Sequence, residues 1–192
     1  AKHTPGYFDE MTEILETERL YLKPISVNDA EFYLELMNTP KWYKYIGDRK
    51  IYTLDAVKPY IQDRMAHQWD THGYGNYILW SKKDPNRALG ACGLFVRAGL
   101  DGCDLGFALM PGAEKQGYAY EASKCVLKHA FESLHLPFLN AITSEENTDC
   151  QRLLSKLGFR YVGEFTVPGE DSSVRKYLLE ANDYAVANGT AK

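Results

Sequence analysis

The segment between a predicted strand and a predicted helix carries the residues best suited to bind an anion. Residues 104–109 (DLGFAL) alternate as a strand does, a Pro-Gly pair then interrupts the alternation, and a helix is expected from Gly117. The first turn of a helix presents unpaired N–H groups and the positive end of the helix dipole, which suits a phosphate or pyrophosphate. Gly117 and Ala119 are small enough for such a ligand to approach the backbone, and Lys115 adds a positive charge. The segment contains neither G-K-[ST] nor G-x-G-x-x-G, so an ordinary strand–loop–helix connection is the competing interpretation.

A second polar segment, residues 147–159 (NTDCQRLLSKLGF), forms another predicted helix. Thr148 and Gln151 fit a capping box, and Asn147 is a good helix cap in its own right. Cys150 fits the apolar stripe of this helix. Taken alone, the segment is explained by helix formation and predicts no chemistry.

The rest of the chain reads as strands and helices in the order β-α-α-β-β-β-α-β-α-β-β, with no repeat, linker or domain boundary. Strands are predicted at residues 16–25, 76–81, 88–96, 103–109, 138–143, 160–167 and 175–179, and helices at 30–37, 53–71, 117–134 and 148–157. This alternation indicates a single α/β (α+β) domain with about four helices. Its core is expected to span about residues 14–180, with a frayed N-terminal segment and a frayed tail from Ala181 to Lys192.

Composition, charge and cysteine usage exclude several classes of protein. Hydrophobic residues make up 45% and charged residues 25% of the 192 residues, which argues against a disordered chain, a collagen and a coiled coil. No signal peptide or apolar stretch of ~18 residues is visible, so no membrane partner is expected. The net charge of -4 weighs against sequence-independent binding of nucleic acid. The four cysteines show no CxxC spacing, which predicts reduced thiols and a cytoplasmic location. The five histidines show no metal-ligand spacing, so no metal site is expected.

Three segments in series carry a family pattern. They are ETERLYL at residues 16–22, LGFAL followed by P-x-x-x-x-x-G-Y-A-x-E-A across residues 105–122, and N-x-x-C-x-x-L-L-x-K-L-G-F across residues 147–159. Together they resemble the GNAT superfamily of N-acetyltransferases, most of all the ribosomal-protein N-terminal acetyltransferase (RimJ/RimL-like) branch. The resemblance covers nearly the whole chain. It implies one GNAT-type domain over residues 1–192, with a central mixed, mostly antiparallel sheet flanked by helices.

The same resemblance implies an acyltransferase that binds acetyl-CoA. The family's acyl-CoA loop has the form Q/R-x-x-G-x-G/A, which matches residues 114–119 here. Backbone N–H groups of this loop would hold the pyrophosphate of coenzyme A, and residues 107–109 would pair with the pantetheine arm as an added strand. Asn147 would contact the same arm. The implied cofactor-binding residues are Phe107, Ala108, Leu109, Lys115, Gln116, Gly117, Tyr118, Ala119 and Asn147.

The candidate catalytic residues are Asp104, on the strand face shared with Gly106 and Ala108, and Cys150, on a position that the resemblance places near the cofactor. Asp104 is the candidate base or amine-orienting group, and the alternative is a surface or turn aspartate. Cys150 is placed near the sulfur of coenzyme A, and the alternative is a cysteine packed in the core. Two positions depart from the family. Glu114 replaces the usual Gln, Arg or aromatic residue, and its side chain is expected to turn to solvent, away from the pyrophosphate. Leu154 stands where many members have a tyrosine acid.

The implied reaction is direct attack of a neutral amine on the acetyl thioester. An α-amine of pKa ~7.7 is about one-sixth neutral at pH 7, whereas a lysine of pKa ~10.4 is neutral about once in 2,500, so an α-amine needs little help. The acceptor stays open among a protein or peptide N-terminus, an amino acid, a polyamine and an antibiotic amine. The second helix and the aromatic segment 42–52 are the candidate walls of its site, and the alternative for the tyrosines of this segment is packing in the core. A homodimer is common in the family. The alternatives are a non-catalytic acyl-CoA sensor on the same fold and an unrelated nucleotide-binding domain.

Overall fold

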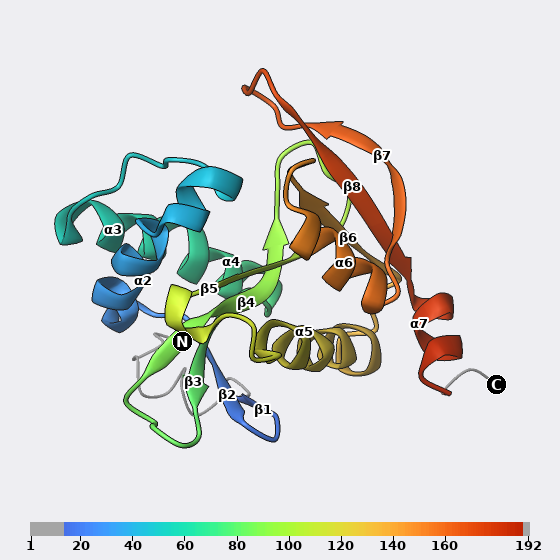
Figure 1. The fold of residues 1–192 in the computed structure, drawn as a ribbon, viewed down its shortest axis with the longest axis horizontal. Coiled ribbons are helices and arrows are strands. Elements are labelled where there is room, and N and C mark those ends of the chain that lie inside the picture. Colours follow the sequence, from blue (N-terminus) through green and yellow to red (C-terminus); the bar gives the residue numbers. More distant parts are fainter. Residues whose placement is uncertain (1–13, 190–192) are drawn as a thin grey trace.

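A single mixed sheet organises residues 14–189, which the computed structural model describes (Figure 1). Its eight strands lie in the order β1-β2-β3-β4-β5-β6-β8-β7, and every neighbouring pair is antiparallel except β5 and β6. The strands are β1 (Leu15–Glu16), β2 (Leu20–Pro24), β3 (Asn76–Ser81), β4 (Ala88–Val96), β5 (Cys103–Leu109), β6 (Phe138–Thr143), β7 (Arg160–Thr166) and β8 (Ser173–Glu180). The predicted mixed, mostly antiparallel sheet of a single α/β domain is confirmed.

Six α-helices flank the sheet, where the sequence predicts about four. They are α2 (Ala30–Met37), α3 (Leu54–Tyr60), α4 (His67–His72), α5 (Tyr118–Lys128), α6 (Thr148–Lys156) and α7 (Ala181–Ala187). The predicted helix 53–71 corresponds to α3 and α4, which the π-helical turn Ile61–Ala66 joins into one continuous helix capped by the side chain of Thr53. Helices α2 to α4 gather on one side of the sheet, and α5 lies on the other side (Figure 1).

The two faces of β5 follow the predicted alternation. Phe107 pairs in register with Cys92, whose sulfur lies 3.8 Å from the hydroxyl of Ser123 in α5, so the Phe107 face points toward that helix. Asp104 and Gly106 therefore belong to the opposite face. A Cβ atom at Gly106 would come within 2.9 Å of the Phe95 ring, so this ring fits over the strand because residue 106 has no side chain.

Strands β5 and β6 part soon after they meet. Their ladder registers one pair, Asp104 with Asn140, whereas β4 and β5 register seven pairs. From Leu105 to Leu109 the backbone of β5 therefore has no strand partner on this side among the described residues. Unpaired strand backbone is an edge to which an extended ligand can add.

The C-terminal segment corrects one prediction. The expected frayed tail is wrong for Ala181–Ala187, which forms α7. Tyr184 of this helix is buried, its ring stacks on Phe131 at 4.8 Å between centroids, and its hydroxyl donates to Glu132 at 2.6 Å. The frayed N-terminal segment was expected at residues 1–13, which lie outside the described residues, as do residues 190–192.

Tyr184→Ala is expected to lower the free energy of unfolding by about 3 kcal/mol, because it leaves a cavity against Phe131 and removes the bond to Glu132. Tyr184→Phe keeps the ring and should cost only about 1 kcal/mol. Urea unfolding of both variants measures the difference. Equal losses in the two variants would show that the ring packing does not stabilise the domain.

All four cysteines are free thiols; Cys92 and Cys103 are buried, and Cys125 and Cys150 are half-buried. Within residues 14–189, no helix is long and apolar enough to cross a membrane, and no three potential ligands gather into a metal site.

Candidate active site

A cavity of about 580 Å³ opens where β5 and β6 part. Its walls come from the N-terminal helices, from β4 and β5, from the loop before α5 and from α6. Eight of the eleven predicted site residues line it: Asp104, Phe107, Ala108, Leu109, Lys115, Ala119, Asn147 and Cys150. The other three, Gln116, Gly117 and Tyr118, lie in the adjoining loop and at the start of α5. Cavities of this size hold small organic ligands.

The loop before α5 is shaped for backbone contacts. Lys115 and Gly117 both have positive φ, 60° and 83°, so successive N–H groups turn toward one side as in an anion-binding nest. Gly117 is the N-cap of α5 and makes no side-chain cap, which leaves the N–H groups of the first turn for a ligand. The side chain of Gln116 donates to the Gly112 carbonyl at 3.1 Å, and the Tyr118 ring packs 4.2 Å from the Arg19 guanidinium. Both side chains therefore make contacts within the protein that shape the loop.

The first and second motif segments meet at this loop. Arg19 donates through Nε to Glu121 at 2.7 Å and through Nη1 to the Gln116 carbonyl at 2.9 Å. Thr17 donates its hydroxyl to the second oxygen of Glu121. The turn between β1 and β2 therefore holds the start of α5 in place. Thr17 and Arg19 of the first motif segment do so through Glu121 of the second.

Glu114 departs from its predicted position. Its side chain lines the cavity, is 22% exposed and pairs with Lys41 at 2.6 Å. The expectation that it turns to solvent is wrong, because the Lys41 ammonium supplies a local partner. This ion pair cancels the negative charge beside the loop that would meet a pyrophosphate.

Lys41→Ala is expected to weaken coenzyme A binding about tenfold, because it leaves the Glu114 carboxylate unpaired beside the pyrophosphate. Glu114→Gln frees the ammonium of Lys41 and should tighten binding, most clearly at low salt. Titration calorimetry at two salt concentrations measures both variants, and the double variant should return toward wild type. Unchanged affinity of Lys41→Ala for coenzyme A at low salt would show that this ion pair has no electrostatic effect on its binding.

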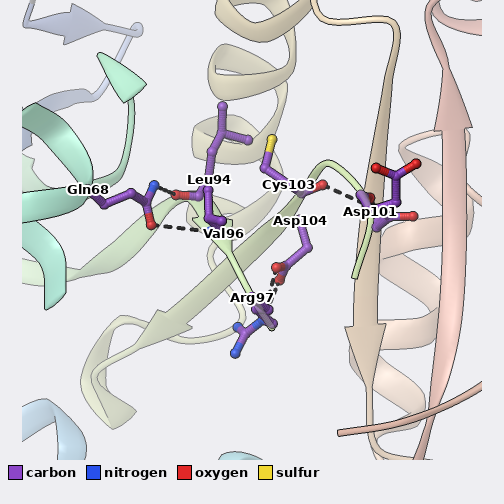
Figure 2. Close-up of polar contacts among 8 residues, drawn as sticks. Gln68, Leu94, Val96, Arg97, Asp101, Cys103 and Asp104 are labelled. Atoms are coloured by element: carbon purple, nitrogen blue, oxygen red, sulfur yellow. Dashed lines mark hydrogen bonds and ion pairs between the residues drawn. The ribbon is translucent and has the colours of Figure 1, made fainter. Parts of the chain in front are cut away.

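Asp104 lies buried at the other end of β5, which rules out the surface or turn aspartate. It is 1% exposed, and Nε of Arg97 donates to its two carboxylate oxygens at 2.9 and 3.0 Å (Figure 2). Burial raises the pKa of Asp104 to about 6, and the Arg97 cation opposes this rise. A carboxylate that titrates near neutrality inside a cavity is suited to accept or orient a proton.

Two amides hold the backbone around this carboxylate. Gln68 of α4 donates to the Leu94 carbonyl at 2.9 Å and accepts from the Val96 N–H at 3.2 Å (Figure 2). Asn140 of β6 donates to the Asp101 carbonyl at 2.6 Å. The end of β4 and the start of β5 are thus fixed from both sides of the point where the sheet opens.

Asn147 and Cys150 meet the cavity at the start of α6. The side-chain oxygen of Asn147 accepts from the Cys150 N–H at 3.2 Å, so Asn147 is the helix cap, as its residue type predicts, and the capping box of Thr148 and Gln151 is not the cap. Gln151 instead donates to the carbonyls of Ser144 and Glu145. The Nδ2 group of Asn147 has no hydrogen-bond partner within the described part of the chain. Burial raises the pKa of the Cys150 thiol, so the thiol stays protonated at neutral pH.

Residues 19–160 match the sequence model of the acetyltransferase (GNAT) domain. The chain belongs to this family. The match covers the second and third motif segments and residues 19–22 of the first, which makes the unrelated nucleotide-binding domain wrong. As a GNAT acetyltransferase the protein is an acyltransferase, and acetyl-CoA is its acetyl donor.

Relatives of this GNAT domain extend over most of the chain. It is 27% identical over 156 residues to the uncharacterized N-acetyltransferase YoaA of Bacillus subtilis, covering 80% of this chain and 86% of that protein. The crystal structure of an acetyltransferase from Agrobacterium tumefaciens superposes with a TM-score of 0.73 at 24% identity, covering 88% of this chain and 94% of the other. The ribosomal L7/L12 α-N-protein acetyltransferase RimL, in complex with coenzyme A, superposes with a TM-score of 0.72 at 12% identity, covering 88% and 98%.

Leu154 remains a departure for a GNAT enzyme. Its side chain is 1% exposed and belongs to the hydrophobic core, although it also reaches the cavity wall. An apolar side chain at this position donates no proton. Cys150 is the thiol that lies on the same helix and the same cavity wall.

Proposed function

We propose that this enzyme acetylates a primary amine, of a protein N-terminus or a small molecule, by direct attack of the neutral amine on acetyl-CoA. The observation that carries the proposal is the layout of the cavity along β5. An anion-binding loop and helix start lie beyond Leu109, and the buried carboxylate of Asp104 lies five residues away at the other end. Five residues of strand span roughly 17 Å, so one extended ligand can touch both ends.

The donor is proposed to bind along the open edge of β5. The N–H groups at the start of α5, around Tyr118 and Ala119, receive the pyrophosphate, and Lys115 adds a positive charge. Residues 107–109 offer their unpaired backbone to the pantetheine arm as an added strand. The Nδ2 group of Asn147 faces the same opening and can donate to a carbonyl of the arm.

Asp104 and Cys150 divide the proton transfers in this proposal. The new bond forms between the amine nitrogen and the acetyl carbon, the C–S bond breaks, and the electron pair leaves with sulfur. Asp104, ionised at pH 7 because its pKa is about 6, accepts the amine proton directly or through water. The protonated thiol of Cys150 donates a hydrogen bond to the departing sulfur, whose pKa as a free thiol is about 8.5, so no stronger acid is needed.

Calorimetry and thiol release test the proposal together. Wild-type protein is expected to bind coenzyme A. It is also expected to convert acetyl-CoA into free coenzyme A, detected by its thiol, when a suitable primary amine is present. Absence of binding to the wild type would overturn the proposal. Binding without turnover across a broad panel of peptides and amines would favour the non-catalytic acyl-CoA sensor. The homodimer and the cytoplasmic location stay predictions, and analytical ultracentrifugation measures the first of them.

A further inference from the structure

The acceptor end of the cavity carries more positive than negative charge. Three arginines line it together with one carboxylate: Arg49 in the aromatic segment 42–52, Arg64 between α3 and α4, Arg97 directly after β4, and Asp104. Asp104 is already engaged by Arg97. The charges of Arg49 and Arg64 are therefore in excess at this end of the cavity.

Neither of these two arginines has a buried counterion. Arg64 makes no ion pair within residues 14–189, and its guanidinium lies 5.4 Å from the Tyr60 ring centroid, one helical turn before it. Arg49 meets Glu170 at 3.7 Å, and this pair is exposed on both sides, at 36% and 46% of the side chains. A bound anion can replace so loose a contact, because exposed ion pairs are weak.

Polar groups without partners lie in the same wall. Asn76 is 2% exposed, its amide nitrogen lies 3.4 Å from the Tyr33 hydroxyl, and its oxygen Oδ1 has no hydrogen-bond partner among the described residues. The indole N–H of Trp42 is buried and, in that same part of the chain, also without a partner. Buried polar atoms in native proteins are nearly always hydrogen-bonded, so these atoms require a polar partner, such as an ordered water, beyond the described residues.

Tyr33 lies in the same cavity wall as these arginines. Burial raises the pKa of the Tyr33 phenol, and the Arg49 and Arg97 cations oppose the rise. Both cations therefore act on this part of the wall.

We propose that the acceptor is a primary amine that also carries an anionic group, a carboxylate or a phosphate, which Arg49 and Arg64 bind while the amine faces Asp104. This inference rests on the proposed function and narrows its acceptor class. Guanidinium groups match carboxylates and phosphates with two parallel hydrogen bonds. Polyamines and polycationic antibiotic amines are excluded as good acceptors, because they would place further positive charge beside Arg49 and Arg64.

The bound anion also decides the charge around the amine. It offsets the charges of Arg49 and Arg64, so these arginines contribute binding and leave removal of the amine proton to Asp104. An amine without an anionic group would meet the charge repulsion of the arginines without the ion pairs that compensate it.

Matched acceptors test the inference. We compare amino acids with their amides, a phosphorylated amine with its dephosphorylated form, short peptides with Asp, Asn or Lys near a free N-terminus, and spermidine, all by thiol release from acetyl-CoA. The anionic member of each pair is expected to give a kcat/KM at least tenfold above its neutral counterpart, with spermidine lowest. The small-molecule and peptide arms show which source of the anion the enzyme uses.

Charge variants separate this role from a structural one. Arg64→Gln and Arg49→Gln should each lower kcat/KM for the anionic acceptor by tenfold or more, mainly through KM, so that its preference over the matched neutral amine falls. Arg64→Lys should restore most of the preference. Arg160→Gln, an exposed arginine of β7 outside the cavity, is the matched control. Circular dichroism of each variant confirms folding.

The acceptor panel distinguishes failure of the anionic-acceptor inference from failure of the proposed amine acetylation. Equal or faster acetylation of neutral or cationic amines would overturn the anionic acceptor and leave amine acetylation intact. If no amine is acetylated, calorimetry of the same panel on the CoA-saturated protein still decides. Binding of anionic amines that Arg64→Gln abolishes supports the acceptor class, and absence of such binding overturns it.

Discussion

Asp104→Asn is expected to lower kcat by about 10²- to 10³-fold, because a well-placed general base contributes this much and an amide accepts no proton. The substitution conserves shape at a side chain that is 1% exposed, so the cavity keeps its walls. Arg97 loses its carboxylate partner in this variant and adds to the positive field. Thiol release with a saturating acceptor measures the loss.

The pH dependence of kcat/KM tests the role of Asp104 more specifically. The wild-type kcat/KM should rise as pH passes through about 6, where Asp104 ionises, and rise again as an α-amine acceptor of pKa ~7.7 loses its proton. Asp104→Asn should keep only the second rise. Arg97→Gln removes the opposing cation, so the first rise should move to higher pH. A first rise that persists in Asp104→Asn would assign it to another group.

Stability should respond to the same carboxyl in a defined direction. The pKa of Asp104 is about 6 in the folded protein and ~3.9 in an unfolded chain, so the folded state holds the proton more tightly between these values. The contribution of this group to stability is therefore full below pH ~4 and is lost as pH rises through about 6. Urea unfolding from pH 4 to 8 should show a flatter profile for Asp104→Asn than for wild type.

Local signals in the sequence predicted most of the elements. Ser26 and Asp29 form the capping box that their spacing indicates, and Thr53 caps the helix that it was expected to begin. Caps and apolar periodicity act within one or two turns, so they can be read without the rest of the fold. The helix α7 was missed because its stability comes from Tyr184 packing on Phe131, a contact 53 residues apart that no local pattern carries.

The residues of the candidate site also fall into those with a local signal in the sequence and those without one. The loop at residues 114–119 was found from the family motif, and Asp104 from the alternation of the strand directly before it. Arg49 and Arg64 were missed because an arginine in a loop or on a helix reads as solvated surface, and only the folded N-terminal layer turns them into the cavity. Arg97 had a usable signal: the Asp-Gly turn after it predicts a hairpin, and the hairpin sets Phe95 opposite Asp104, two residues from the arginine.

Ala119→Glu is expected to weaken coenzyme A binding by about 100-fold or more while leaving the fold intact. Ala119 lines the cavity and is the second residue of α5, so a carboxylate there lies among the N–H groups proposed to hold the pyrophosphate. Negative charge repels the phosphates at short range. The same charge interacts favourably with the helix dipole, worth about 0.3–1 kcal/mol, so stability should stay level or rise.

Ala119→Gln separates the charge from the bulk. Glutamine fills the same volume without a charge, so it should weaken binding less than glutamate, and the gap between the two should narrow at high salt. Calorimetry measures both affinities, and thermal unfolding without coenzyme A shows whether either variant loses stability. Wild-type affinity in Ala119→Glu would place the pyrophosphate away from the start of α5. Since Lys115, Asn147 and the open edge of β5 all meet the cavity beside this turn, that result would overturn the whole proposed path of the donor.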